Sequence, residues 1–223
     1  MENESIKKLI LNFFFDSLLF DKKFQKRAID LINKTKVLDY TKEGNTYLDI
    51  GSGTGHICEQ LAKEKKLKLI ALEPKSKPSS QILKRLNDKE EKIIFLKGLG
   101  EQLPFKNQRF DGIFLFFVLH HVSSAIESKI FNEIQRVIKP DGLLFIVEDT
   151  PENEEERNKN EKWDRRINLE PRNEKHYYKS NIQWLEFFKK NGYSIVEKSY
   201  FEGKTFKGYP IRHWSYILKK NYR

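Results

Sequence analysis

Cysteine is almost absent from the chain, because Cys58 is the only one among 223 residues. No disulfide can form within the chain, so a disulfide-stabilised scaffold is excluded and a reducing, cytoplasmic setting is expected. Long apolar runs are missing as well. The apolar stretch at residues 13–20 is too short to cross a bilayer and contains Asp16. We therefore expect no membrane span, and the start of the chain lacks the features of a signal peptide.

Clustered basic residues are also absent. The formal charge is +10, from 42 Lys and Arg against 32 Asp and Glu, but no run of five or more basic residues occurs. A basic chain can meet nucleic acid, an anionic membrane or an acidic small molecule. Because the lysines are scattered, a generally lysine-rich composition explains the charge better than a dedicated binding surface. Hydrophobic residues make up 38% of the chain, which is enough for a folded core.

Strands and helices alternate through the middle of the chain. Apolar residues recur at helical spacing over residues 5–35, and an alternation of strands and helices follows. The expected strands are 46–50, 67–72, 93–96, 110–118 and 143–147, and the expected helices are 56–66, 82–86 and 128–138, the last closed by a turn at 139–142. This pattern predicts a parallel sheet with right-handed crossovers in an α/β fold.

The alternation stops after the fifth strand. Residues 149–178 begin with an acidic segment and continue with aromatic and basic residues, which indicates an insertion. A helix at 182–191 and two closing strands at 193–200 and 214–218 follow, joined by a segment, 201–213, that we expect to be a hairpin loop. We predict one domain with four parts: a helical cap at 1–45, a cofactor-binding core at 46–148, an acceptor-side insertion at 149–180 and a closing part at 181–223.

The most informative segment is the glycine-rich turn after the first strand. It reads Asp49-Ile50-Gly51-Ser52-Gly53-Thr54-Gly55. Glycines let the backbone turn sharply and let a ligand approach it closely, and the following helix N-terminus offers N–H groups. The turn therefore predicts a ligand at the carboxyl end of the first strand.

Two carboxylates narrow the choice of ligand. The dinucleotide fingerprint requires a third glycine at position 56, but His56 stands there. Asp49 would repel a pyrophosphate, whereas it can accept a hydrogen bond from an α-ammonium group. Glu73 ends the second strand, where a carboxylate suits the two hydroxyls of a ribose. The pattern favours an amino-acid-like nucleoside ligand over NAD.

Taken together, these residues resemble the class I S-adenosylmethionine-dependent methyltransferases, especially small-molecule enzymes with a Leu-His-His segment. The resemblance covers roughly residues 46–146 and rests on five motifs in the family's order. Besides the glycine turn and Glu73, they are the segments 101–105, 110–113 with 119–122, and 137–142. Where the family often has Asp-Ala before the adenine-side loop, this chain has Leu99-Gly100.

The resemblance implies a Rossmann-like, doubly wound sheet of seven strands with the last strand antiparallel. It implies S-adenosylmethionine as cofactor and S-adenosylhomocysteine as product, and no metal. The cofactor-binding residues that it implies are Asp49, Gly51, Ser52, Gly53, Gly55, Glu73, Pro74, Gly100, Glu101 and Phe116.

The acceptor side is predicted from residues that follow the fourth and fifth strands. His120 and His121 are candidates for a catalytic base or an acceptor-orienting group, with a turn-capping role as the alternative. The insertion offers Trp163, Arg166, Tyr177 and Tyr178 for acceptor binding, with a buried helical cover as the alternative. We interpret Glu148 and Asp149 as a solvated strand end, and Cys58 as a packing residue.

Three functions are compatible with the sequence. The first is methyl transfer to a small molecule. The second is a tRNA or rRNA methyltransferase, which the net charge makes conceivable and which requires one continuous basic patch. The third is a non-catalytic S-adenosylmethionine-binding protein, for which Leu99 is the supporting residue. The sequence does not fix the oligomeric state.

Overall fold

A computed structural model describes residues 18–74, 82–84, 93–168, 170–171, 173–204 and 208–221. The chain divides into two compact units, residues 1–97 and 98–223. The part of the expected first helix before residue 18 lies outside the described residues. Of the expected helix at 82–86, residues 82–84 are helical and residues 85–86 lie outside the described residues. No helix in the described part of the chain is long and apolar enough to cross a membrane.

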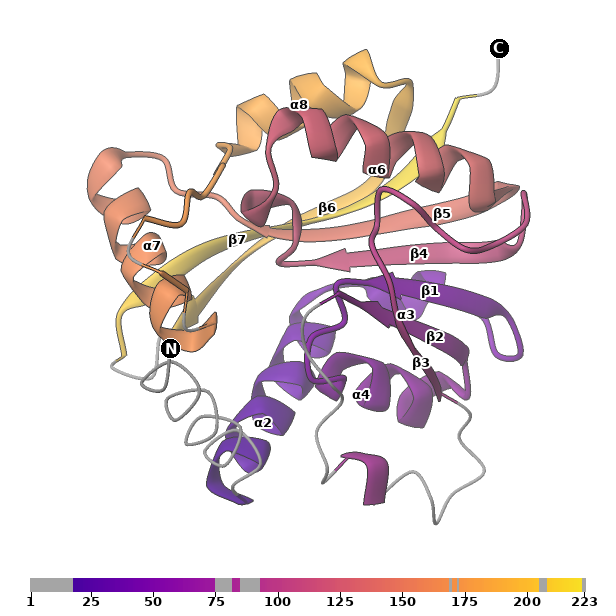
Figure 1. The fold of residues 1–223 in the computed structure, drawn as a ribbon, viewed down its shortest axis with the longest axis horizontal. Helices are drawn as coiled ribbons and strands as arrows, with labels where there is room; N and C mark the ends of the chain where they lie inside the picture. Colours follow the sequence, from indigo (N-terminus) through magenta and orange to yellow (C-terminus); the bar gives the residue numbers. More distant parts are fainter. Residues whose placement is uncertain are drawn as a thin grey trace, which may run out of the picture. The chain divides into compact units, whose positions relative to one another are not determined.

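The first unit contains three parallel strands and the helices beside them (Figure 1). Strand β1 pairs with β2, and β2 pairs with β3. Helix α2 packs on α4, where the rings of Phe24 and His56 lie 5.5 Å apart. The elements are α2 (Leu18–Lys34), α3 (Val37–Tyr40), β1 (Thr46–Ile50), α4 (His56–Lys65), β2 (Lys68–Glu73) and β3 (Ile93–Lys97). Short apolar strands that alternate with amphipathic helices give this layout, as the sequence predicts.

The second unit contains four strands in the order β4-β5-β7-β6. Helices α6 and α8 pack together through Phe131 and Phe187, whose rings are 4.8 Å apart (Figure 1). A capping box fixes the start of α8, because Ser180 and Gln183 exchange hydrogen bonds between side chain and backbone. The elements are β4 (Phe110–Phe116), the 3₁₀ helix η1 (Leu119–His121), α6 (Ser124–Val137), β5 (Ile138–Asp149), α7 (Glu154–Asn168), α8 (Asn181–Lys190), β6 (Tyr193–Lys204) and β7 (Pro210–Lys220).

The complete strand order is β3-β2-β1-β4-β5-β7-β6, with six strands parallel and β7 antiparallel to both of its neighbours. This order confirms the predicted Rossmann-like sheet of seven strands. The predicted insertion after strand five contains α7. The division into one domain with four parts stays a prediction.

Most boundaries lie within one or two residues of the sequence prediction, and three regions differ more. The expected turn at 139–142 lies inside β5, where the pairing with β4 shifts register between Phe110 and Gly112. The Pro-Asp-Gly sequence therefore marks an irregularity in a strand rather than its end. Helix α6 starts at Ser124 instead of 128, because its first turn has no buried apolar residue to reveal it. The expected loop at 201–213 is mostly paired strand, since β6 runs to Lys204 and β7 begins at Pro210.

Candidate functional site

The glycine turn after β1 depends on backbone conformations that favour glycine. Gly51, Gly53 and Gly55 have φ values of 76°, 54° and 91°. A Cβ at Gly55 would lie 2.8 Å from the Phe95 ring, whereas one at Gly53 would meet nothing within 4 Å. The turn is therefore packed on one side at Gly55 and open at Gly53, where a ligand can approach the backbone.

The turn is fastened to the end of β2. The amides of Gly51 and Ser52 both donate to the Leu72 carbonyl, at 2.8 and 3.1 Å. The Gly53 amide donates to Glu73 Oε2 at 3.0 Å. Glu73 thus holds the turn, and a carboxylate that accepts this bond still has lone pairs for the hydroxyls of a ribose.

Asp49 lies beneath the turn and is 2% exposed. The thiol of Cys58 donates to its Oδ2 at 3.0 Å. Burial raises the pKa of Asp49, the thiol bond opposes this, and the negative charge of Glu73 raises the pKa further, to about 7. A buried carboxylate in this state favours a positively charged partner.

Other polar groups of the first unit surround the turn. Ser52 Oγ is buried and has no hydrogen-bond partner among the described residues. His56 contacts Thr54 Oγ1 at 2.8 Å through Nδ1 and Asp21 Oδ1 at 3.0 Å through Nε2. The imidazole therefore links the turn to helix α2, while Ser52 keeps a hydroxyl that a ligand can satisfy.

A cluster of polar side chains around His120 and Glu148 lies in the second unit, beyond the end of β4. Glu148, at the end of β5, is fully buried and accepts hydrogen bonds from the amides of Val118 and Leu119 at 2.9 and 2.7 Å. Its other oxygen contacts His120 Nδ1 at 2.6 Å. The expectation of a solvated strand end at Glu148 and Asp149 is wrong, because both side chains are buried against neighbouring elements.

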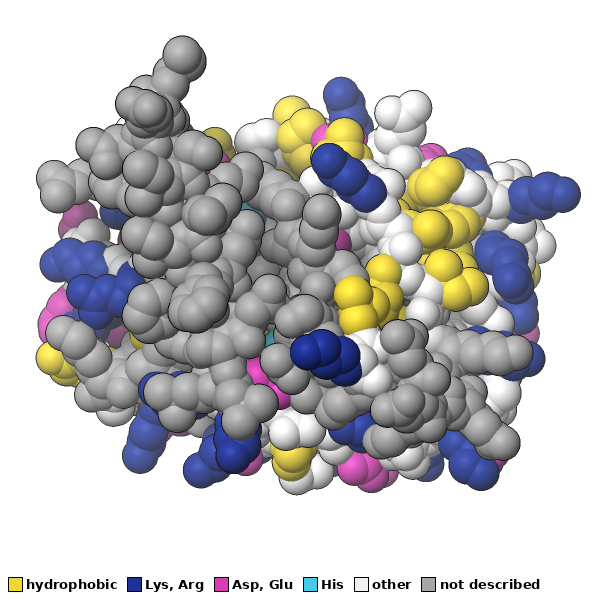
Figure 2. All heavy atoms as spheres, turned by 60° about the horizontal axis from the view of Figure 1, so that its bottom comes forward, with side chains coloured by type: hydrophobic (Ala, Val, Ile, Leu, Met, Phe, Trp, Pro, Cys, Tyr) yellow, Lys and Arg dark blue, Asp and Glu magenta, His cyan; other side chains and the backbone are white. Residues whose placement is uncertain are grey.

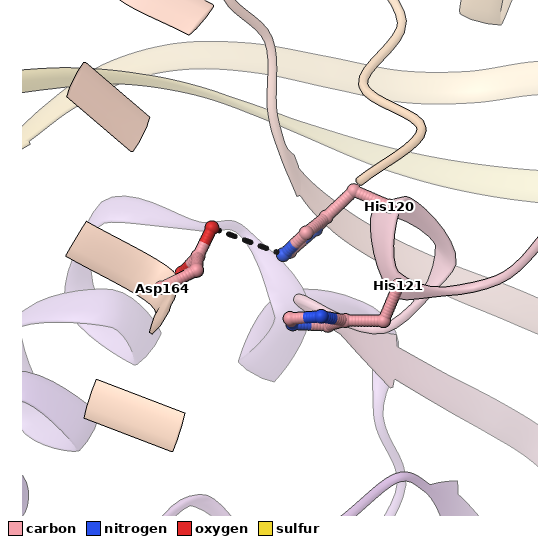
Figure 3. A group of neighbouring side chains, drawn as sticks. All are labelled: His120, His121 and Asp164. Atoms are coloured by element: carbon pink, nitrogen blue, oxygen red, sulfur yellow. Dashed lines mark ion pairs between the residues drawn. The ribbon is translucent and has the colours of Figure 1, made fainter. Parts of the chain in front are cut away.

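The other face of His120 meets helix α7. Its Nε2 lies 3.5 Å from Asp164 Oδ2 and makes no hydrogen bond among the described residues (Figure 3). Tyr178 donates its hydroxyl to Asp164 and stacks on His120, with ring centroids 4.9 Å apart. Burial alone lowers the pKa of His120, but Glu148 and then Asp164 and Asp149 raise it to about 9. A protonated imidazole cannot take a proton, so an orienting role fits His120 better than a base role.

His121 belongs to a neighbouring set of contacts. Its Nδ1 lies 3.2 Å from Glu170 Oε1, and His176 Nε2 contacts the other oxygen of Glu170 at 2.8 Å. Burial raises the pKa of Glu170, but the two imidazoles outweigh burial and hold it well below its usual range. Three histidines and three carboxylates therefore gather within the second unit.

Comparison with known proteins identifies the core of the chain. Residues 48–146 match the family model described as a methyltransferase domain. This similarity supports a class I methyltransferase domain in that part of the chain. Norajmaline N-methyltransferase from Rauvolfia serpentina is 31% identical over 111 residues, which are 49% of this chain and 37% of that protein. The chain spans about a third to a half of the length of this and the next two curated relatives.

Solved structures share the fold of the methyltransferase domain. A SAM-dependent methyltransferase from Methanosarcina mazei superposes with a TM-score of 0.66 at 20% identity and covers 84% of this chain and 97% of that one. The [4+2]-cyclase SpnF superposes with a TM-score of 0.63 at 15% identity, over 89% and 81% of the two chains. Since a cyclase has the same architecture, the fold alone does not determine the reaction.

The remaining cofactor residues predicted for the methyltransferase domain occupy varied surroundings. Pro74 is half-buried at the end of β2, and Gly100 is buried beside the half-buried Glu101. Phe116 is buried at the end of β4. Leu99, at the position where the family often has an acid, is 48% exposed and pairs with Gln102 in an isolated bridge.

The four predicted acceptor residues do not share one environment. Trp163 and Tyr178 are buried, and Tyr177 is half-buried, with its amide donating to the His120 carbonyl at 2.7 Å. Arg166 is exposed on α7. The structure brings Tyr178 to His120, whereas Trp163 belongs to the buried face of α7 together with Asn160 and Asp164.

The sequence did not reveal several residues that lie near the glycine turn or in the cluster around His120. Cys58 was interpreted as packing, yet it is the donor to Asp49. Asp164 could have been found, since Asn160, Trp163 and Asp164 follow helical spacing and place polar groups on one buried face. Glu170 and His176 lie in irregular backbone near Pro171, where no periodic pattern points to a contact.

Proposed function

We propose that the chain transfers a methyl group from S-adenosylmethionine to a small-molecule acceptor and releases S-adenosylhomocysteine. Asp49 carries the proposal. It is a buried carboxylate with a raised pKa under a glycine turn, and its described donor is the thiol of Cys58. A cofactor with an α-ammonium group would supply the missing positive charge.

The residues of the turn fit the rest of such a cofactor. Ser52 Oγ is a buried hydroxyl without a partner among the described residues, and the backbone is open at Gly53. Glu73 would bind the ribose hydroxyls while its other bond holds the Gly53 amide. Pro74, Gly100, Glu101 and Phe116 are assigned to the nucleoside side by resemblance to the family.

The chemistry needs little covalent help from the protein. When bound, S-adenosylmethionine supplies an electrophilic methyl group that an acceptor lone pair displaces in line, and the electrons of the broken C–S bond stay on sulfur. Holding the reactants in line lowers the barrier by about 7–11 kcal/mol in ideal intramolecular cases. Asp49 and Glu73 would fix the donor, and His120, held by Glu148, would orient the acceptor.

A small molecule is the acceptor class with the best support. The name of the relative from Rauvolfia serpentina identifies a small-molecule N-methyltransferase. Among the described residues on the face in Figure 2, Lys and Arg side chains lie singly or in small groups among other kinds of side chain, without one continuous basic patch. Trp163, Arg166, Tyr177 and Tyr178 remain the proposed acceptor contacts, together with His120 and His121.

Calorimetric titration tests the proposal. The wild-type chain should bind S-adenosylmethionine with micromolar affinity and should not bind NAD. Asp49→Asn should weaken binding by about a hundredfold, because a buried ammonium would lose its charged partner. Asp30→Asn, an exposed change in the same unit, should leave binding unchanged. Absence of binding by the wild type, or equal binding by Asp49→Asn, would contradict the proposal.

A further inference from the structure

We propose that His120, His121 and Asp164 form a binding site for a divalent transition-metal ion. Each offers one ligand atom, and the three atoms lie within 4.8 Å of one another (Figure 3). The two histidines belong to η1 and the aspartate to α7, so the site lies wholly within the second unit. The site differs from the expectation of no metal, and it does not depend on methyl transfer.

Both imidazoles are oriented as metal ligands usually are. A metal-bound histidine commonly donates its other ring N–H to a carboxylate, which fixes the ring and its tautomer. His120 Nδ1 contacts Glu148 at 2.6 Å, and His121 Nδ1 lies 3.2 Å from Glu170. In each ring this leaves Nε2 as the nitrogen for a metal.

The independent observation is the state of His120 Nε2. The side chain is 1% exposed, and this nitrogen makes no hydrogen bond among the described residues, although it faces Asp164. The 3.5 Å separation from Asp164 Oδ2 is an ion-pair distance that is too long for a good hydrogen bond, and a buried nitrogen that lacks a hydrogen bond is rare. A cation between His120 and Asp164 would satisfy it.

The distances suit a small metal ion. Ligand atoms about 2.0–2.1 Å from a tetrahedral metal lie about 3.3 Å apart. The separation of His120 Nε2 from Asp164 Oδ2 is 3.5 Å. His121 is 26% exposed, and its ligand atom lies within 4.8 Å of the other two. The Tyr178 hydroxyl holds the aspartate in place.

The ligand set indicates the class of metal. Two imidazoles and one carboxylate suit zinc and similar first-row divalent ions, rather than calcium or magnesium, which prefer oxygen. Three protein ligands leave a fourth position for water or an oxygen or nitrogen atom of another molecule. Local charge also favours a cation, since Glu148, Asp164 and Glu170 lie beside the imidazoles. A coordinating imidazole is neutral, so a bound metal ion would replace the proton that these carboxylates favour on His120.

Metal binding by the chain without a polyhistidine tag tests the site. After treatment with a chelator, the wild type should take up one equivalent of Zn²⁺ in equilibrium dialysis with elemental analysis. His121→Asn and Asp164→Asn should each weaken binding at least tenfold. His213→Asn should not, although His213 is also buried and contacts a carboxylate, Asp149, at 2.6 Å. Unchanged Zn²⁺ binding in both ligand variants would refute the site.

A competing arrangement uses His121, Glu170 and His176, whose ligand atoms are equally close. His176→Asn decides between them: retained Zn²⁺ binding supports the proposed site, and loss of binding overturns it. If His176→Asn fails to fold, Asp164→Asn decides, because Asp164 belongs only to the proposed site: loss of Zn²⁺ binding supports the site, and retained binding overturns it. X-ray absorption of the Zn²⁺-loaded wild type that shows no imidazole scattering would also overturn the site. Because S-adenosylmethionine binding is measured separately, either proposal can fail alone.

Discussion

Asp49 and Glu148 are both buried carboxylates at the ends of parallel strands, yet their surroundings differ. Glu148 accepts two backbone amides and contacts an imidazole, whereas Asp49 accepts a bond from a thiol, which is a weak donor. Both side chains are almost completely buried, so their surroundings differ in the hydrogen-bond donors that each carboxylate has. Glu148 has strong hydrogen-bond donors within the fold and therefore positions its neighbours. The described donor to Asp49 is weaker, and Asp49 is therefore suited to bind a positively charged ligand.

The largest expected effect is the loss of stability when Glu148 is replaced. Glu148→Gln should lower the free energy of unfolding by about 3–5 kcal/mol, because it breaks a buried charged contact and sets an amide N–H₂ against donors. Urea denaturation of the free protein measures this. Glu155→Gln on the exposed surface of α7 should cost less than about 1 kcal/mol. Similar losses of stability in Glu148→Gln and Glu155→Gln would refute the claim that the contacts of Glu148 stabilise the fold.

Replacement of Asp49 should have the opposite effect and stabilise the free protein at neutral to alkaline pH. A carboxyl with a raised folded pKa holds its proton in the folded state, so the free protein loses stability as pH rises from about 4 to about 7. The full loss is at most about 4 kcal/mol. Asp49→Asn should remove it and make the free protein more stable at pH 8. Urea denaturation at pH 5 and pH 8 measures the gain, and a less stable variant at pH 8 would contradict the assignment.

The affinity for S-adenosylmethionine should depend on pH through the same group. An ammonium group pairs with the ionised form of Asp49, so affinity should be constant above pH 7 and fall about tenfold per unit below it. Calorimetry across pH 5 to 8 tests this expectation. The weak binding of Asp49→Asn should show no such slope, and a slope that persists in this variant would assign the titration to another group.

The smallest effect is expected from the thiol. Cys58→Ala removes a hydrogen bond that favours the ionised carboxylate, so the pKa of Asp49 should rise and the midpoint of the affinity curve should move to higher pH by less than about one unit. Cys58→Ser keeps a donor and should not produce this rise. An alanine variant with the wild-type midpoint would show that the thiol does not act on Asp49.

The sequence predicted the parts of the fold that depend on local patterns. Strand β1 was placed at its observed bounds, because five residues between a turn and a glycine segment leave little freedom. The sequence did not show that residues 139–142 lie in a strand, since pairing with β4 overrides the turn preference of Pro-Asp-Gly.

The residues at the glycine turn were predicted more completely than the cluster around His120. Asp49, Gly53 and Glu73 were predicted together from the glycine turn and the family resemblance. The structure joins Gly53 and Glu73 by a hydrogen bond, and the role of the three residues in cofactor binding stays a prediction. The contacts of His120 were not found, since Glu148 and Asp164 come from distant elements and no spacing rule links them. Cys58 was missed because a lone thiol in an apolar helix face gives no sign of its acceptor.

Strand β7 comes last in the chain but lies between β5 and β6. Until residues 210–220 leave the ribosome, β5 has one unpaired edge and β6 has no described partner in the sheet. The second unit therefore closes its sheet only after β7 has been synthesised. The pairing of β7 with β5 is distant in sequence, and its pairing with β6 is local. Nascent chains that stall before β7 emerges would leave this edge of β5 unpaired, so dependence on chaperones should be greatest just before β7 has been synthesised.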